Sequence, residues 1–157
     1  MSFKVITDKV AGVLKNIKQI ENARVLVGIP KEENARSDDP MGNAGIGYIQ
    51  EIGSPAQNIP ARPFLIPGVK AIEDKAADIL KDGASKVLEN GTMTAHLTKA
   101  GIIASNSVKD TITKGEGFEP LAESTIKARQ RKGFKGTKPL IRTGQLRNSI
   151  TYIVKEA

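Results

Sequence analysis

Hydrophobic residues recur every three or four positions at the start of the chain, which is the spacing of one face of an α-helix. The positions are Phe3, Ile6, Val10, Val13, Leu14, Ile17 and Ile20. Residues 23–29, ARVLVGI, are rich in β-branched side chains and predict a strand that ends at Pro30. A second helical pattern covers residues 43–52 and ends at Gly53. Its apolar face is predicted to consist of Ala44, Tyr48, Ile49 and Ile52.

The second half of the chain predicts three more helices and one strand. Apolar residues at helical spacing indicate a helix over residues 69–88 and another over residues 93–112. Pro120 suits the first position of a further short helix. Apolar and polar residues then alternate along residues 149–154, which predicts a final strand.

Together these elements predict an α+β fold in one domain, residues 1–157. We expect a small sheet that includes the first and last strands and packs against several helices. The helix over residues 69–88 is expected to cover one face of this sheet. Residues 31–42 are polar, contain several turn formers, and predict a flexible loop.

Three prolines interrupt the helical patterns in the sequence NIPARPFLIPG, residues 58–68. Proline fixes φ, removes a backbone donor and pushes the preceding residue towards extended geometry. The segment therefore predicts a stiff, extended arm that is neither helix nor central strand. Its apolar run suggests that Phe64 is an anchor residue, seated either in the core or in a neighbour's pocket.

Charge is distributed unevenly along this basic chain. The net charge is +7, yet residues 1–123 carry 15 Lys and Arg against 16 Asp and Glu, a balance of −1. Residues 124–157 carry 9 against 1, a balance of +8. Most of this excess lies in and around a basic loop, residues 132–142. The loop is either a solvated surface or a surface that faces an anion, such as nucleic acid phosphates or an acidic protein partner.

The residues that usually carry chemistry are scarce. The chain has no cysteine and a single histidine, His96, which we interpret as a packed or capping side chain. No acidic cluster has metal-ligand spacing, and no phosphate-binding glycine loop is present. We therefore expect no catalytic, cofactor or metal site. The first residues, MSFKVITDK, lack the apolar run of a signal peptide, and no stretch is long enough to span a membrane.

Two segments resemble segments shared by small head–tail junction proteins of tailed bacteriophages. They are YIQEIGSPAQNIPARPFLIPGV, residues 48–69, and KPLIRTGQLRNSITYIV, residues 138–154. Neck, tail-completion and Mu-type virion-morphogenesis proteins carry an IPARPF arm and later a PLIxTGxLRxSI pattern that leads into a strand. Both patterns occur here in that order. In the second, we expect a turn with positive φ at Gly144, and we expect Leu146 and Ile150 to pack inward.

This resemblance implies a non-enzymatic structural protein of the virion, assembled in the host cytoplasm as a homo-oligomeric ring at the head–tail junction. The implied partners are portal, adaptor, head-closure or tail-tube proteins, with non-specific contact to DNA in the channel. The candidate partner-binding residues are Arg62, Phe64, Leu65, Ile66, Arg142 and Arg147. The candidates for contact with DNA or another anion are Arg129, Arg131, Lys132, Lys135 and Lys138.

Two other classes of function remain open on the sequence. The first is a nucleic-acid-binding protein that uses the basic C-terminal region. Such a protein would bind DNA tightly as a monomer, with strong salt dependence. The second is a small enzyme, for which the sequence offers no catalytic arrangement.

Overall fold

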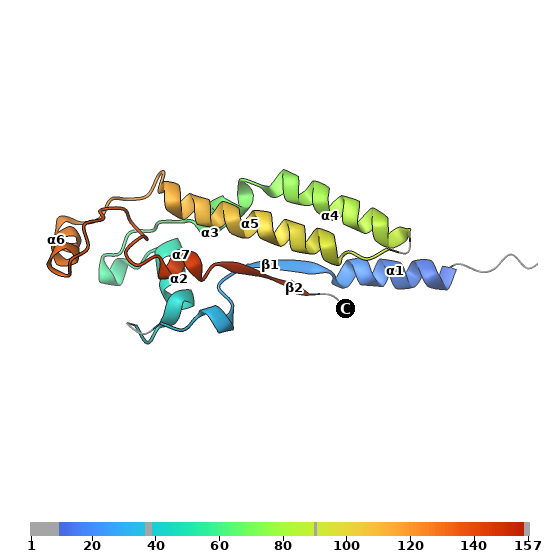
Figure 1. The fold of residues 1–157 in the computed structure, drawn as a ribbon, viewed down its shortest axis with the longest axis horizontal. Helices are drawn as coiled ribbons and strands as arrows, with labels where there is room; N and C mark the ends of the chain where they lie inside the picture. The colour runs from blue at the N-terminus through green and yellow to red at the C-terminus, as the bar shows by residue number, and fades with distance from the viewer. Residues whose placement is uncertain (1–9, 37–38, 90, 156–157) are drawn as a thin grey trace, which may run out of the picture.

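The computed structural model describes residues 10–36, 39–89 and 91–155. These residues form an elongated α+β structure with helix α1 at one end and helix α6 at the other (Figure 1). In chain order the elements are α1 (Val10–Asn22), β1 (Arg24–Gly28), α2 (Gly42–Ile52), α3 (Leu65–Lys70), α4 (Glu73–Leu88), α5 (Thr94–Lys114), α6 (Glu123–Arg131), α7 (Gln145–Asn148) and β2 (Thr151–Lys155), with short 3-10 turns at Lys31–Glu33 and Pro55–Gln57.

The sheet of the described residues consists of β1 and β2 alone, paired antiparallel. Leu26 lies opposite Ile153, and the register runs from Arg24 opposite Lys155 to Gly28 opposite Thr151. This confirms the predicted α+β fold and the predicted sheet between the first and last strands. Strand residues alternate between two faces. Accordingly Leu26 and Ile153 point to solvent, and their neighbours on each strand face the helices.

Helix α5 covers the inner face of the sheet, and α4 packs on α5 and α1 (Figure 1). The prediction that residues 69–88 form the covering helix is therefore wrong. That segment is also broken, because α3 ends at Lys70 and α4 begins at Glu73. Small residues on α5 allow the sheet to come close. A Cβ added at Gly101 would overlap the ring of Tyr152 on β2, so only glycine permits this packing.

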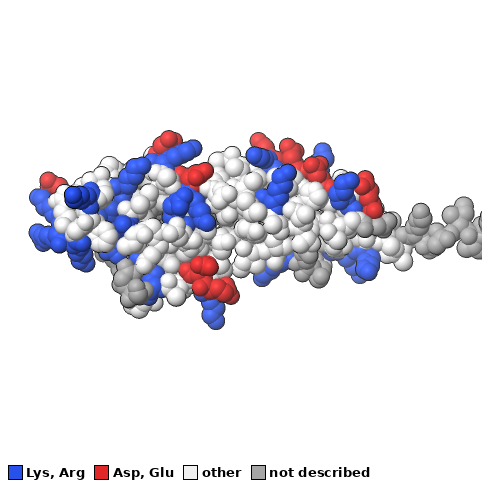
Figure 2. Space-filling model, viewed as in Figure 1, with Lys and Arg blue, Asp and Glu red and all other residues white. Residues whose placement is uncertain are grey.

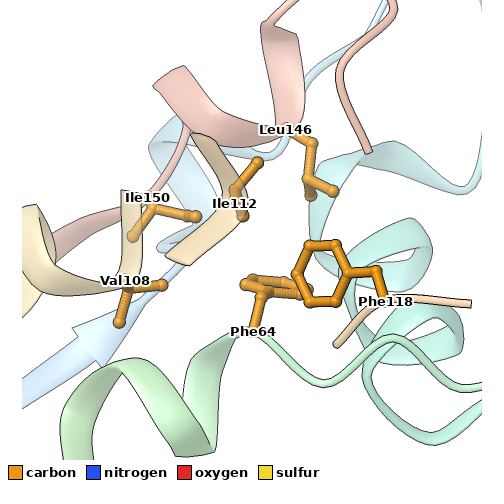
Figure 3. Packing of buried hydrophobic residues seen from close by; sticks show 6 residues of the cluster. All are labelled: Phe64, Val108, Ile112, Phe118, Leu146 and Ile150. Carbon is orange, nitrogen blue, oxygen red and sulfur yellow. The ribbon is translucent and has the colours of Figure 1, made fainter. Parts of the chain in front are cut away.

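The main hydrophobic core brings together residues that are far apart in sequence (Figure 3). It contains Phe64, Val108, Ile112, Phe118, Leu146 and Ile150, all of them buried. A second cluster, Val87, Met93 and Leu97, lies at the other end of the sheet. It is closed by half-buried residues such as Ile20 of α1 and Val25 of β1. The core thus runs along α5 between the helices and the sheet.

The described part of the 31–42 loop makes hydrogen bonds to the start of α2. Asn34 Oδ1 accepts a hydrogen bond from Ala44 N at 2.7 Å, and Asn43 Nδ2 donates to Glu33 O at 3.0 Å. Gly42 adopts φ +74°, where a Cβ would strike Asn34. Residues 37–38 lie outside the described residues.

Candidate interaction surfaces

The proline-rich arm is not extended over its whole length, because Asn58 adopts φ 52° and ψ 37° in the left-handed region. Residues 60–64 have no regular secondary structure, and helix α3 begins at Leu65. The expectation that the whole of 58–68 is extended is wrong for Asn58 and for the last four residues. Pro67 falls within the first turn of α3, where the backbone N–H has no partner inside a helix, so a proline is tolerated there.

Glu51 of α2 explains why a helix starts directly after the arm. Its carboxylate accepts three backbone hydrogen bonds, from Phe64 N at 2.7 Å, Leu65 N at 2.8 Å and Ile66 N at 3.0 Å. A helix begins with unpaired N–H groups and a partial positive charge, and a carboxylate satisfies both. Sequence reasoning missed Glu51, because no capping residue stands next to α3 in the chain.

Arg62 points into the protein and not towards a partner. Only 5% of its surface is exposed. Its Nε donates to Glu119 O at 2.6 Å, one terminal nitrogen to Pro120 O at 3.0 Å, and the other to Gln50 Oε1 at 3.4 Å. Burial lowers the pKa of Arg62, and the nearby charge of Glu119 opposes that shift. Arg62 thus ties the arm to α2 and to the chain before α6, although it was a candidate for binding a partner.

The three apolar residues of the arm have different environments. Phe64 is 3% exposed and lies in the main core, as the anchor prediction allowed (Figure 3). Leu65 is half-buried against the same core. Ile66 is 68% exposed. Of the three, only Ile66 presents most of its side chain to a partner.

The TGQLRNSI segment forms a turn into β2, as predicted. Gly144 adopts φ +80°, and Leu146 and Ile150 are buried in the main core. Arg147 Nε donates to Thr113 Oγ1 of α5 at 2.8 Å and is half-buried. Arg142 is exposed and lies over the ring of Phe134, 5.5 Å from its centre. Arg147 therefore serves the fold, while Arg142 lies at the surface.

The two segments that resemble phage junction proteins come together in space. Phe64 of the first shares a core with Leu146 and Ile150 of the second, and α2 packs against α7. The segments are separated by most of α4, α5 and α6 in the sequence. Their apolar residues therefore act as one structural unit.

The candidate anion-binding residues divide into two groups. Arg129 donates to the carbonyls of Lys138, Ile141 and Gly136 at 2.9, 3.3 and 3.4 Å, and so shapes the basic loop. Burial lowers the pKa of Arg129, and the charges of Arg142 and Arg62 lower it further. Lys138 Nζ donates to Thr113 O at the end of α5, at 3.1 Å.

The remaining three basic residues, Arg131, Lys132 and Lys135, are exposed. They belong to the end of the molecule that carries α6, where Lys and Arg gather (Figure 2). Both signs of charge occur over α4 in the same view. This end of the molecule, with Arg131, Lys132 and Lys135, is called the basic end below.

Two apolar helix faces are exposed in the structure. On α1, the surface comprises Val10, Val13, Leu14 and Ile17. On α2, Tyr48 and Ile52 are 66% and 56% exposed, and the buried side is formed by Asn43 and Gly47. Gly47 lets α2 approach Ile29, Leu146 and Phe64 closely. The face of α2 with small residues is therefore buried, and the face with large apolar residues is exposed.

A groove of about 980 Å³ separates α6 from the rest of the protein. One wall consists of α2 and the arm, including Gln50 and Arg62. The other consists of α6, including Ala128, Arg129 and Lys132. No residue of α6 is buried, which is consistent with a helix that stands off from the core.

Neither a metal-binding cluster nor a membrane-spanning helix occurs among the described residues. No group of three or more His, Cys, Asp or Glu side chains comes close enough to hold a metal ion. His96 is half-buried beside Gly83, and its Nδ1 has no hydrogen-bond partner in the described part of the chain. Within that part, no helix is both long and apolar enough to cross a membrane. No protein-family model matches the chain, and neither a curated protein nor a solved structure matches it.

Proposed function

We propose that this chain is a structural subunit of a homo-oligomeric ring at the head–tail junction of a tailed bacteriophage. The observation that supports the proposal is the contact between the IPARPF and TGQLRNSI segments of the chain. These are the segments that resemble phage neck and tail-completion proteins, and they share one core through Phe64, Leu146 and Ile150. If each segment resembled phage proteins only because it forms a common type of turn, the two segments would have no reason to pack together.

The exposed apolar surfaces support a subunit of this kind. A ring grows through a head-to-tail contact, in which one patch of a subunit meets a different patch on its neighbour. The α1 surface lies at one end of the elongated molecule, and the α2 surface lies nearer the other (Figure 1). Ile66, whose backbone nitrogen binds Glu51 of α2, extends the second surface. We assign these two surfaces to opposite sides of the subunit contact.

The basic end supports contact with an anionic surface in the assembled junction. Each exposed cation contributes weakly on its own, about 0–1 kcal/mol as a surface pair. A ring repeats that contribution once per subunit. The assembled ring is therefore expected to bind DNA phosphates without sequence preference and with strong salt dependence, while the free monomer binds DNA little at physiological salt.

Native mass spectrometry on the purified chain and three variants tests the subunit contact. Leu14→Glu places a charge in the α1 surface, and Tyr48→Glu does so in the α2 surface. Ile102→Glu, at an exposed position of α5 outside both surfaces, is the matched control. We expect a closed oligomer from the parent and the control, and monomers from the other two.

Mixing the two surface variants distinguishes a head-to-tail contact from other kinds. Each variant retains one intact surface, so one Leu14→Glu subunit pairs with one Tyr48→Glu subunit and growth stops at a dimer. A parent that is monomeric and binds duplex DNA at nanomolar strength in physiological salt would overturn the proposal in favour of a nucleic-acid-binding protein. Normal oligomers from both surface variants would show that the contact is elsewhere.

A further inference from the structure

The groove beside α6 carries an excess of positive charge. Its cationic side chains are Arg36, Arg62, Arg129, Lys132 and Arg142. Its acidic side chains among the described residues are Asp39 and Glu119, so the described lining has a balance of +3. The groove is therefore an electropositive recess and is distinct from the apolar surfaces on α1 and α2.

The best-buried arginines of the groove are not neutralised by direct contact with a carboxylate. The acceptors of Arg62 are two backbone carbonyls and the Gln50 amide oxygen, and those of Arg129 are three backbone carbonyls. Carbonyl oxygens satisfy N–H groups but carry no net charge. The charges of Arg142 and Arg62 lower the pKa of Arg129, which indicates that the guanidinium groups repel one another. A bound anion would relieve that repulsion.

The lining of the groove also defines the shape and polarity of its occupant. Ile46, Ile59, Leu121 and Leu140 add apolar surface among the charges. None of the described residues that line the groove is aromatic, so they offer no platform on which a nucleotide base could stack. A DNA duplex is convex, and its phosphates reach exposed cations such as those of the basic end more readily than a recess. The groove therefore favours a narrow occupant with both aliphatic and anionic groups.

We propose that this groove binds an extended segment of a partner protein that carries carboxylate side chains beside aliphatic ones. Lys132 and Arg142 are the exposed cations of the groove, and their N–H groups suit the carboxylates of the segment. The aliphatic lining receives the apolar side chains between the acids. The extended form suits a groove whose walls come from α2, the arm and α6. This inference concerns a different surface from the ring contact and does not depend on ring assembly.

Fluorescence anisotropy with two labelled peptides tests the proposal on the full chain. One peptide alternates Glu and Leu, and the other alternates Gln and Leu. We expect the Glu peptide to bind at least about tenfold more tightly, equivalent to about 1.4 kcal/mol. A thymidine oligonucleotide of equal charge serves as the competitor that represents nucleic acid. Inorganic phosphate shows whether any small anion displaces the peptide.

Two neighbouring substitutions on α6 separate the groove from general electrostatics. Ala128→Glu introduces a negative charge into the groove wall. Lys127→Glu makes a larger charge change at a side chain that is 61% exposed and does not line the groove. We expect Ala128→Glu to weaken binding of the Glu peptide about tenfold or more, and Lys127→Glu to weaken it less than about threefold.

Several outcomes would overturn the proposal. The first is equal binding of the Glu and Gln peptides, and the second is tighter binding of the oligonucleotide than of the Glu peptide. The third is an equal loss of binding in both variants, which would indicate attraction to overall charge and not to the groove. Absence of binding by the Glu peptide at any soluble concentration overturns it as well. Circular dichroism of each variant confirms that the fold is retained.

Discussion

Replacement of Phe64 by alanine tests whether the arm is anchored through the core. The ring is 3% exposed and is surrounded by Val108, Ile112, Phe118 and Leu146 (Figure 3). The substitution removes the ring's transfer free energy and leaves a cavity. Hydrogen bonds to Glu51 from the backbone nitrogens of Phe64 and of the two residues after it hold the arm in place and limit collapse around that cavity.

The expected loss is large for a single substitution. Truncation of a phenylalanine in a packed core lowers the free energy of unfolding by about 3–5 kcal/mol. For a domain of this size, 1 kcal/mol shifts Tm by about 2–4 °C, so we expect Tm to fall by roughly 6–20 °C. Urea and thermal unfolding, followed by far-UV circular dichroism, measure both quantities.

The control for this experiment lies two residues along the same segment. Ile66 is 68% exposed, so Ile66→Ala is expected to change the free energy of unfolding by less than about 0.5 kcal/mol. If Phe64→Ala unfolds at the same urea concentration and temperature as the parent, the reasoning that places the anchor in the core is wrong. An equal loss in both variants would contradict it too.

Three further substitutions test particular contacts. Glu51→Ala removes the acceptor of three backbone N–H groups at the start of α3 and is expected to lower the free energy of unfolding by about 1–3 kcal/mol in urea titration; an unchanged midpoint would contradict the capping role. Gly101→Ala forces a Cβ into the ring of Tyr152 and is expected to lower the free energy of unfolding by about 1–3 kcal/mol. Gly12→Ala, on the exposed helix α1, meets no neighbour and is expected to raise the free energy of unfolding by about 0.5–1 kcal/mol. Arg129→Ala frees three carbonyls of the basic loop and should speed amide hydrogen exchange there without unfolding the core; Arg129→Lys should not restore protection, because an ammonium lacks the planar fork.

The sheet was predictable from sequence because its signal is local. Residues 23–29 and 149–154 carry the two strongest strand patterns, and the structure pairs them. Which helix covers the sheet was not predictable, because the segments that form α4 and α5 both show apolar residues at helical spacing. Helix α5 can cover the sheet because it has a glycine, with no side chain, at position 101. Gly101 makes room for Tyr152, and that complementarity depends on residues 51 positions apart in the chain.

The arm shows a similar limit for the candidate site. Its prolines predict a chain that is neither helix nor central strand, and residues 60–64 follow that prediction. The start of α3 depends on Glu51, which is 13 to 15 residues away from the amides that it binds. The direction of Arg62 depends on carbonyls of residues 119 and 120, which are 57 and 58 residues away. Local sequence patterns contain no information about either contact.

The exposure of these apolar surfaces could not be predicted, for a related reason. Periodicity identifies an apolar helix face but does not show what covers it. The apolar face of α1 meets α4 only in part, so Leu14 stays 54% exposed. On α2, the small residue Gly47 packs closer than the large residues do, and it decides which side is buried. These two exposed faces are the features that led to the proposed subunit contact.

The proposed function places the gene of this chain in a phage genome, and a nonsense mutation in that gene is the most direct test of the proposal. Particles made with and without suppression of the mutation are compared by electron microscopy. The account predicts that filled heads and completed tails accumulate separately without the chain, and that joined particles return when it is supplied. Joined, infectious particles formed without the chain would contradict the account.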